Sequence, residues 1–160
     1  KLKLLQDFID EHLPDILNIP EIFGEQVEVD ENEIIIYEEK RLLANALKKP
    51  VNEVEEFVHS IGGIFIPAHI DRLKNSIYSQ LGFLPDNLKA DALEVSRATT
   101  VAKFAGLHPE IRKYPLTRSS DSHFPDSIGQ YTTVLMMKEK SFSEVKMALA
   151  GTGGRKIIPE

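Results

Sequence analysis

The chain has 160 residues, enough for one ordinary domain with a core of its own. Its contents of 42% hydrophobic and 28% charged residues are typical of globular proteins, and the longest apolar runs, such as IGGIFIPA, are far too short for a membrane span. A formal net charge of −6 disfavours a broad basic face, so charge does not indicate nucleic acid as a partner.

The first 13 residues carry apolar side chains at helical spacing from Leu2 onward, and they predict a helix that ends before Pro14. The chain begins without methionine, without a capping residue and without a secretory signal. We therefore expect a single domain over residues 1–160 that is a fragment of a longer cytoplasmic protein.

The next two predicted elements are a β-hairpin and a helix. Apolar and polar residues alternate over residues 25–39, with the polar stretch DEN in the middle, which favours a hairpin. Leucines and alanines at helical spacing then predict a helix over residues 40–49, closed by Pro50.

From residue 50 onward, helical patterns alternate with short apolar runs, which predicts α/β architecture with a parallel sheet. The first helix of this part ends at Gly62, a typical C-terminal cap. The glycine-rich tail from Gly151 reads as a flexible turn. The predicted helices are 50–61, 71–82, 99–107 and 141–151, and the predicted strands are 64–72, 91–97, 114–123 and 131–138.

Polar residues stand at the end of three successive predicted strands: His69, Glu94, and Asp121 with His123. In parallel α/β architectures, ligands and catalytic groups gather at this edge. The chain has no cysteine, so a metal ion would need His, Asp or Glu ligands. In Asp-x-His, two residues of an extended segment point to the same side, which suits a shared ion.

Each of these residues also has a structural interpretation. An aspartate after a strand often caps a helix, and His69 in its apolar context fits a buried histidine with a hydrogen-bond partner. For Glu94 there are two structural alternatives: strand alternation turns its side chain away from the edge, or its carboxylate pairs with Arg97. Both interpretations remain open on the sequence alone.

An arginine accompanies each predicted strand end. A guanidinium beside a metal ion suits bidentate binding of phosphate oxygens, which makes Arg72 and Arg97 candidate phosphate ligands. The alternative is that each arginine pairs with a nearby carboxylate, and we favour this alternative for Arg118.

Three motifs in order resemble the PHP (polymerase and histidinol phosphatase) domain family. IPAHIDR looks like the family's segment that ends in a ligand histidine, and ALEVSR resembles the strand that follows in one bacterial branch. SSDSHFPDSIG looks like the closing Ser-Asp-x-His motif. The resemblance covers roughly residues 7–149, and the order and spacing of the motifs make it specific.

The resemblance implies a distorted, TIM-related parallel β/α barrel and a cluster of divalent ions, zinc, manganese or iron, whose bridging hydroxide attacks phosphate esters. His69, Asp121 and His123 match its ligand positions. Glu94 and Ser120 are expected beside the ligands, where they would orient them. The hairpin is a small excursion from this α/β fold.

The His-x-His motif and the other N-terminal ligands of the family are absent from the chain. We therefore expect the C-terminal part of the barrel, which binds fewer ions than an intact domain and is inactive alone. Its unpaired strand edges would need the missing N-terminal half or self-association.

Three functions remain as hypotheses. The first is a piece of a metal-dependent phosphoesterase that hydrolyses phosphate mono- or diesters of a phosphorylated small molecule or nucleotide. The second is a non-catalytic PHP remnant with a regulatory or structural role in partner binding. The third is an unrelated α/β module that binds an anion at its strand ends.

Overall fold

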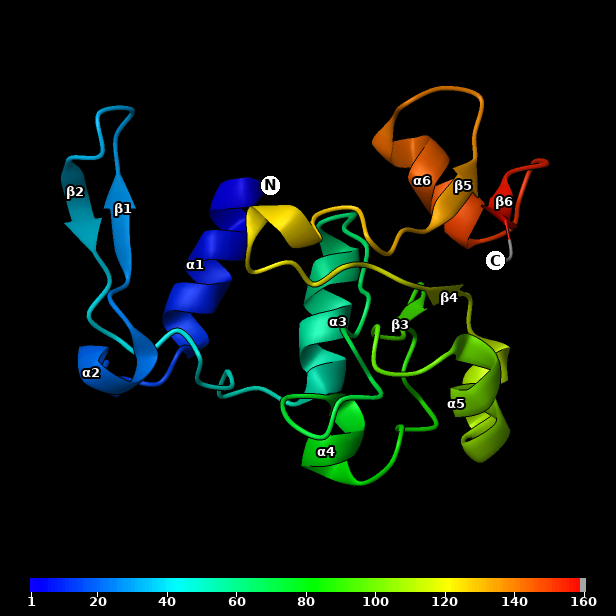
Figure 1. Cartoon of the computed structure of the whole chain (residues 1–160), viewed down its shortest axis with the longest axis horizontal. Coiled ribbons are helices and arrows are strands. Elements are labelled where there is room, and N and C mark those ends of the chain that lie inside the picture. The colour runs from blue at the N-terminus through cyan, green and yellow to red at the C-terminus, as the bar shows by residue number, and fades with distance from the viewer. Residues whose placement is uncertain (159–160) are drawn as a thin grey trace. The chain divides into compact units, whose positions relative to one another are not determined.

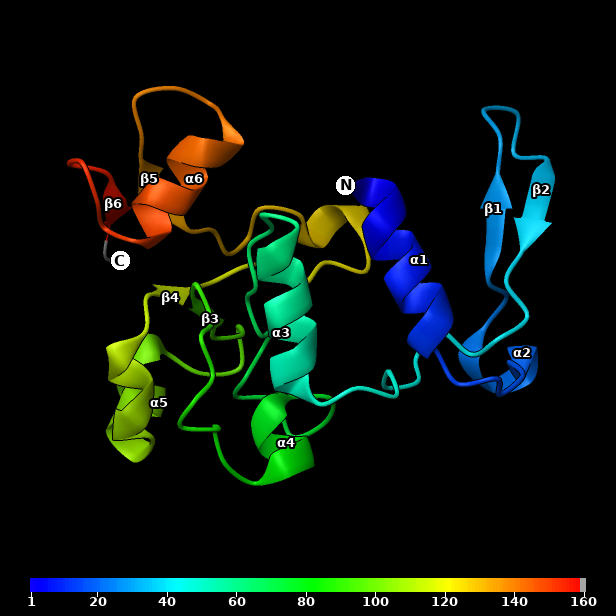
Figure 2. The same ribbon diagram turned by 180° about the vertical axis from the view of Figure 1, so that it is seen from behind.

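The computed structural model describes residues 1–158, and the chain divides into two compact units, Lys1–Phe57 (unit 1) and Val58–Glu160 (unit 2). Figures 1 and 2 show their helices and strands from two sides. The fold is mixed α/β, with strands in three separate two-stranded sheets, and residues 1–158 form no closed barrel. That these residues belong to one domain of a longer protein stays a prediction.

Unit 1 contains the predicted first helix and the predicted hairpin. The helix ends one residue before Leu13, which adopts the extended conformation that the following proline favours. The hairpin is antiparallel, and the Asp30 carboxylate holds its turn by accepting the N–H groups of Asn32 and Ile34. The elements of unit 1 are α1 (Leu2–His12), α2 (Pro20–Phe23), β1 (Val27–Val29) and β2 (Ile35–Glu38).

The helix predicted over residues 40–49 is wrong, because the backbone of this segment is used for contacts with other parts of unit 1. The Leu42 N–H donates to the carbonyl of Ile16, and the Lys40 carbonyl accepts from Asn18. Leu42 itself is buried, so tertiary pairing outweighs the local preference for a helix.

A polar network joins this segment to the rest of unit 1. The Arg41 guanidinium donates to the carboxylates of Glu39 and Asp10, each at 2.9 Å. The Gln26 amide donates to the Arg41 carbonyl at 2.7 Å and accepts the N–H of Leu43 at 2.9 Å. These contacts fix the base of the hairpin without burying much apolar surface.

From α3 onward the predicted alternation of helices and strands is found only in part, because α4 follows α3 without a regular strand between them and only a 3₁₀ turn separates β4 from β5. Gly62 follows α3 with a φ of 75°, as expected of a C-terminal cap, and serine or threonine side chains cap α4, α5 and α6. The elements are α3 (Val51–Ser60), α4 (Ile77–Leu81), β3 (Leu93–Glu94), α5 (Val101–Leu107), β4 (Leu116–Thr117), β5 (Val134–Met136), α6 (Phe142–Leu149) and β6 (Lys156–Ile158), with short 3₁₀ turns η1 (Pro109–Lys113) and η2 (Pro125–Ser127).

The core of unit 2 surrounds β3, which pairs in parallel with β4. Leu93 and Val95 are completely buried, as are Ile70 and Ile111. Burial of a Leu or Ile side chain contributes about 1.5–3 kcal/mol to folding. This core holds the ends of β3 and β4 in place, and Glu94, Arg97 and Asp121 lie at or shortly after these ends.

The segment predicted as a strand over residues 64–72 is extended and hydrogen-bonded to β3, but it does not form a regular strand. The Glu94 N–H donates to the carbonyl of Pro67, and the Glu94 carbonyl accepts the N–H of Ile70. The two partners are three residues apart, one more than a regular parallel ladder allows, and Pro67 has no N–H to donate. A backbone bulge thus places His69 in the left-handed region, with a φ of 34°.

The tail from Gly151 does not end as a flexible turn, because residues 156–158 form β6. This strand pairs antiparallel with β5, so the last predicted strand joins the tail and not a parallel sheet. Arg155 donates to both oxygens of Glu144, at 2.7 and 2.8 Å, and holds the pKa of that carboxyl at about 2. The last two residues of the predicted turn lie outside the described residues.

Within residues 1–158, the structure contains no helix with the length and apolar character that crossing a membrane requires.

Candidate functional site

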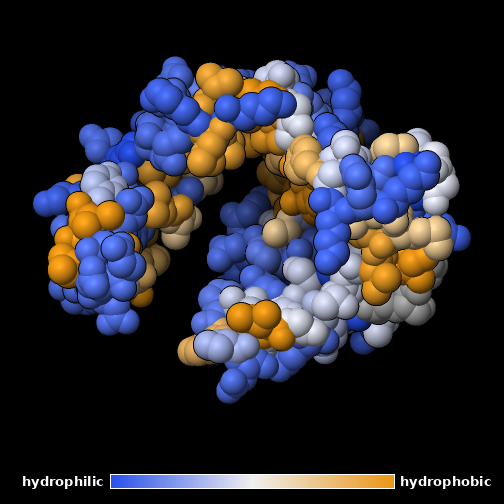
Figure 3. Space-filling view, turned by 90° about the horizontal axis from the view of Figure 1, so that it is seen from above, coloured by the Kyte–Doolittle hydropathy of each residue, from blue (hydrophilic) through white to orange (hydrophobic). Residues whose placement is uncertain are grey.

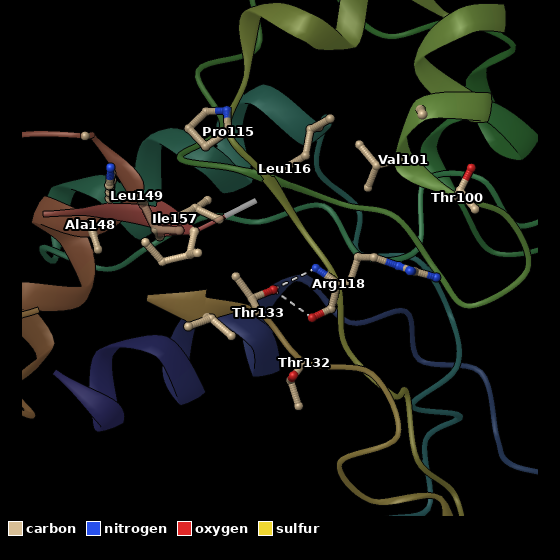
Figure 4. Close-up of a pocket in the computed structure, with 15 residues that line it drawn as sticks. Thr100, Val101, Pro115, Leu116, Arg118, Thr132, Thr133, Ala148, Leu149 and Ile157 are labelled. Carbon is tan, nitrogen blue, oxygen red and sulfur yellow. Dashed lines mark hydrogen bonds between the residues drawn. The ribbon is translucent and has the colours of Figure 1, made fainter. Parts of the chain in front are cut away.

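The predicted Asp-x-His motif lies on a loop that two side chains pin at its base. The Ser120 hydroxyl donates to the Tyr131 carbonyl and accepts the Tyr131 N–H, both at 3.0 Å. Figure 4 shows the second pair, in which the Thr133 hydroxyl accepts the Arg118 N–H and donates to the Arg118 carbonyl, both at 2.8 Å. These side-chain hydrogen bonds join residues 118 and 120 to residues 133 and 131, where no strand pairing does so. Residues 121–130 therefore form a loop after β4 whose two ends are held together.

Asp121 opens this loop with a φ of 46°, a conformation that aspartate tolerates better than most residues. Its carboxylate accepts a hydrogen bond of 2.6 Å from Arg72. The Nδ1 of His123 lies 2.9 Å from the Asp121 carbonyl oxygen. Because a carbonyl only accepts, Nδ1 donates in this bond, and the other ring nitrogen, Nε2, has no hydrogen-bond partner among residues 1–158.

His69 and Glu94 meet at the end of β3. The His69 N–H donates to Oε1 of Glu94 at 3.2 Å, and the Ser119 hydroxyl donates to Oε2 at 2.6 Å. Glu94 thus links three neighbouring segments, and its partner is not Arg97. The Nδ1 of His69 is buried and has no hydrogen-bond partner among residues 1–158, a costly arrangement for a polar atom.

The three arginines of the predicted edge differ in their contacts. Arg72 pairs with a carboxylate, that of Asp121. The Arg118 guanidinium donates to the carbonyl of Thr99 at 3.1 Å and lies over the ring of Tyr131, 4.7 Å from its centre. Arg97 is exposed and forms no hydrogen bond or ion pair through its side chain within residues 1–158.

The residues of this chain do not by themselves fit the metal centre that the resemblance implies. No group of three His, Asp or Glu side chains among residues 1–158 is placed to share an ion. Asp121 is bound to Arg72, and both oxygens of Glu94 are occupied. The roles of His69, Asp121 and His123 as metal ligands stay predictions. The observation that most favours a ligand at this edge is the buried Nδ1 of His69, which has no hydrogen-bond partner among residues 1–158.

Two pockets next to this edge contain residues that the sequence did not suggest. One, of about 410 Å³, is lined by Arg97, Ala98, Thr99, Thr100, Lys103, Arg118 and Tyr131. The other, of about 620 Å³, is mostly apolar and shares Thr100 and Arg118 with it (Figure 4). Lys103 was predictable in principle, because a helix that follows a strand places its first turn near the strand end.

A further polar anchor at this edge is Asp71, whose partner is Ser96 and not an arginine. Its carboxylate accepts the N–H of Ser96 at 2.6 Å and the Ser96 hydroxyl at 2.8 Å. The Ser96 hydroxyl in turn accepts the N–H of Ala98 at 3.0 Å. These bonds fix the start of the loop that carries Arg97.

Comparison with known proteins relates the chain to one group of solved structures. No protein-family model matches it. It is 27% identical to endonuclease Q in a complex with a 27-mer duplex substrate that has an abasic lesion at the active site, with a TM-score of 0.59 over 69% of this chain and 29% of that one. The lesion-specific endonuclease PfuEndoQ from Pyrococcus furiosus shares the fold, with 24% identity and a TM-score of 0.64 over 98% of this chain and 35% of that one.

Among curated proteins, the uncharacterized protein YqxK of Bacillus subtilis (strain 168) is 32% identical in an alignment of 110 residues that covers 66% of this chain and 28% of that protein. The chain thus spans about a third or less of each relative. It resembles part of endonuclease Q.

Proposed function

We propose that the chain is part of a phosphodiesterase that acts on DNA, of the same kind as endonuclease Q. The observation that carries the proposal is the likeness to endonuclease Q bound to a duplex with an abasic lesion. It agrees with the resemblance of three motifs to the PHP family, because an endonuclease hydrolyses a phosphate diester. The net charge of −6 is compatible with this proposal, since a local group of cations suffices for phosphate contacts.

In this proposal the chain supplies one polar edge of the DNA site. His123 presents its free Nε2 on the pinned loop, and Arg72 is within reach of the same loop through Asp121. A metal ion at this edge would need ligands beyond those that residues 1–158 bring together. We therefore assign binding and orientation of DNA to these residues and derive no metal-dependent step.

The test is binding of a labelled 27-mer duplex with one central abasic site, compared with the same duplex undamaged, by fluorescence anisotropy at low ionic strength. We expect tighter binding of the abasic duplex. Asp121→Asn should abolish the difference, because it breaks the ion pair with Arg72. Asp126→Asn is the matched control, since it removes the same charge from an exposed side chain of the same loop. Failure to bind either duplex would contradict the proposal.

A second candidate function is a non-catalytic one, a PHP-like remnant that binds a partner. The absence of a three-ligand group among residues 1–158 favours it. The two candidates separate in a nicking assay on the abasic duplex with added Mn²⁺, carried out with the full-length polypeptide that contains these residues. Nicking that His123→Ala removes supports the phosphodiesterase, and intact duplex together with retained DNA binding supports the remnant.

A further inference from the structure

We infer that the pocket of about 410 Å³ next to the strand ends is a binding site for a phosphate group, with Arg97 and Lys103 as its ligands and with Arg118 and Tyr131 as its wall. The inference rests on the proposed function, since it names the part of the substrate that this unit would hold. We call this site the phosphate pocket.

The charges of the pocket favour an anion. Three of its lining residues are cationic, and none of the described lining residues is acidic, although the whole chain carries a net charge of −6. Arg97 and Lys103 are exposed, and neither side chain forms a hydrogen bond or ion pair within residues 1–158. Cations that line the same pocket repel one another, and a bound anion reduces this cost. Arg72, whose charge Asp121 compensates, shows the contrast.

The pocket is also organised in advance of binding. The loop before Arg97 is fixed through Ser96, which both Asp71 and Ala98 hold by hydrogen bonds. Thr100 caps α5 by accepting the N–H of Lys103 at 3.2 Å, which sets the position where this lysine leaves the helix. A ligand therefore has to order two side chains and no loop, which lowers the entropic cost of binding.

Arg118 forms the wall of the pocket. Its guanidinium donates to the carbonyls of Thr99 and Ser96, at 3.1 and 3.4 Å, and its Cζ lies over the ring of Tyr131, 4.7 Å from the ring centre. These hydrogen bonds and the cation–π contact hold the arginine side chain in place, and the guanidinium keeps its charge. It adds positive potential to the pocket without depending on the ligand for its position. Beyond Arg118 the neighbouring pocket is largely apolar, so the charge selectivity lies in the phosphate pocket.

The test compares two double variants that lose the same charge. Arg97→Gln with Lys103→Gln removes the ligands of the pocket, and Arg112→Gln with Lys140→Gln removes an exposed arginine and an exposed lysine elsewhere in unit 2. The probes are inorganic phosphate, a nucleoside monophosphate, and a dinucleotide whose only phosphate is the internal diester, each titrated by calorimetry. Thermal melting checks that all variants fold.

We expect the pocket variant to bind its preferred probe at least about tenfold more weakly than the wild type, because charged hydrogen bonds to phosphate are lost. The control should change affinity less than twofold. Preference for the dinucleotide identifies a backbone phosphate, and preference for the monophosphate identifies a terminal one. Equal losses in the two double variants, or no binding of any probe by the wild type, would overturn the inference.

These outcomes are separate from the test of the proposed function. If the wild type binds the small probes through Arg97 and Lys103 but binds neither duplex, the phosphate pocket stands and the DNA proposal fails. If it binds the abasic duplex and the pocket variant binds that duplex equally well, the DNA proposal stands and the phosphate pocket is wrong. In a salt titration of duplex binding, the pocket variant should lower the slope by about 1–2.

Discussion

The two units of the chain are built in different ways. Within residues 1–57, Leu13 and Leu42 are the buried apolar residues, whereas unit 2 buries eleven, with Ile70, Leu93 and Ile111 completely inaccessible. Every residue of both hairpin strands in unit 1 is exposed, and Figure 3 shows apolar side chains at the molecular surface. Unit 1 relies on polar contacts around Arg41, and unit 2 relies on a core. The predicted site residues all belong to the unit with the core, which is what a fixed geometry requires.

The largest expected change in stability comes from a substitution that removes side-chain atoms from the core of unit 2. Leu93→Ala should lower the free energy of unfolding of unit 2 by about 2–5 kcal/mol, because it leaves a cavity at a completely buried position. Chemical denaturation with hydrogen exchange by segment measures the loss and assigns it to a unit. Leu73→Ala is the control, since that side chain is 95% exposed and should change stability by less than about 0.5 kcal/mol. Equal losses at both positions would contradict a core centred on β3.

A smaller difference between the stabilities of the two units is expected on acidification. Hydrogen bonds from Arg41 lower the pKa of Glu39 to about 2, and hydrogen bonds from Arg155 do the same for Glu144. Both carboxyls bind fewer protons in the folded chain, so their contribution to stability is present above their ordinary pKa of 4.5 and is lost as the pH falls towards about 2. With less apolar burial to compensate, unit 1 should lose its hydrogen-exchange protection at a higher pH than unit 2.

The matched variants for the acid experiment are Glu39→Gln and Glu144→Gln. Each should reduce the acid dependence of its own unit between pH 4.5 and 2 and leave that of the other unchanged, because each carboxylate pairs within its own unit. Part of the dependence should remain, since the pKa of Asp30 in unit 1 and that of Glu110 in unit 2 are lowered as well. A single acid transition that both variants shift equally would mean that the two units unfold together.

The smallest expected effect is a stabilisation of unit 2. A methyl group at Gly106 of α5 would meet no atom within 4 Å apart from its chain neighbours and the backbone of its own helix. Gly106→Ala should raise the free energy of unfolding by about 0.5–1 kcal/mol, since alanine loses less backbone entropy on folding. Ala102→Gly in the same helix should lower it by a similar amount. Thermal melting detects both changes, and a loss of stability in Gly106→Ala would show that α5 packs more tightly than the structure indicates.

The sequence predicted local elements better than the way they pair. The helix over α3 with its Gly62 cap and the hairpin were predicted because their signals are local. The helix over residues 40–49 was wrong because Ile16 and Asn18, far away in the sequence, take up its backbone groups. The strand β6 was missed because its pairing with β5 depends on a turn and on the ion pair between Arg155 and Glu144.

The candidate site shows the same limit. Spacing placed His69, Glu94 and Asp121 at the ends of neighbouring segments, and the bond from His69 to Glu94 shows how close two of these ends are. Spacing could not predict that Ser119 donates a hydrogen bond to Glu94 or that Arg72 donates one to Asp121. Such pairings depend on the directions of the side chains in the folded chain. Tyr131 was missed because it reaches the site only through the closure of the loop by Ser120.

The left-handed backbone at His69 and Asp121 has a consequence for reading sequence variation at this edge. At both positions the folded chain has a positive φ, which glycine and asparagine adopt at a lower cost in free energy than other residues do. In a mutant library selected for abundance alone, these two residues should therefore accumulate at positions 69 and 121. Histidine and aspartate should outlast them only under selection for activity. Each position would then record two pressures with different preferred residues, and comparing the two selections separates them.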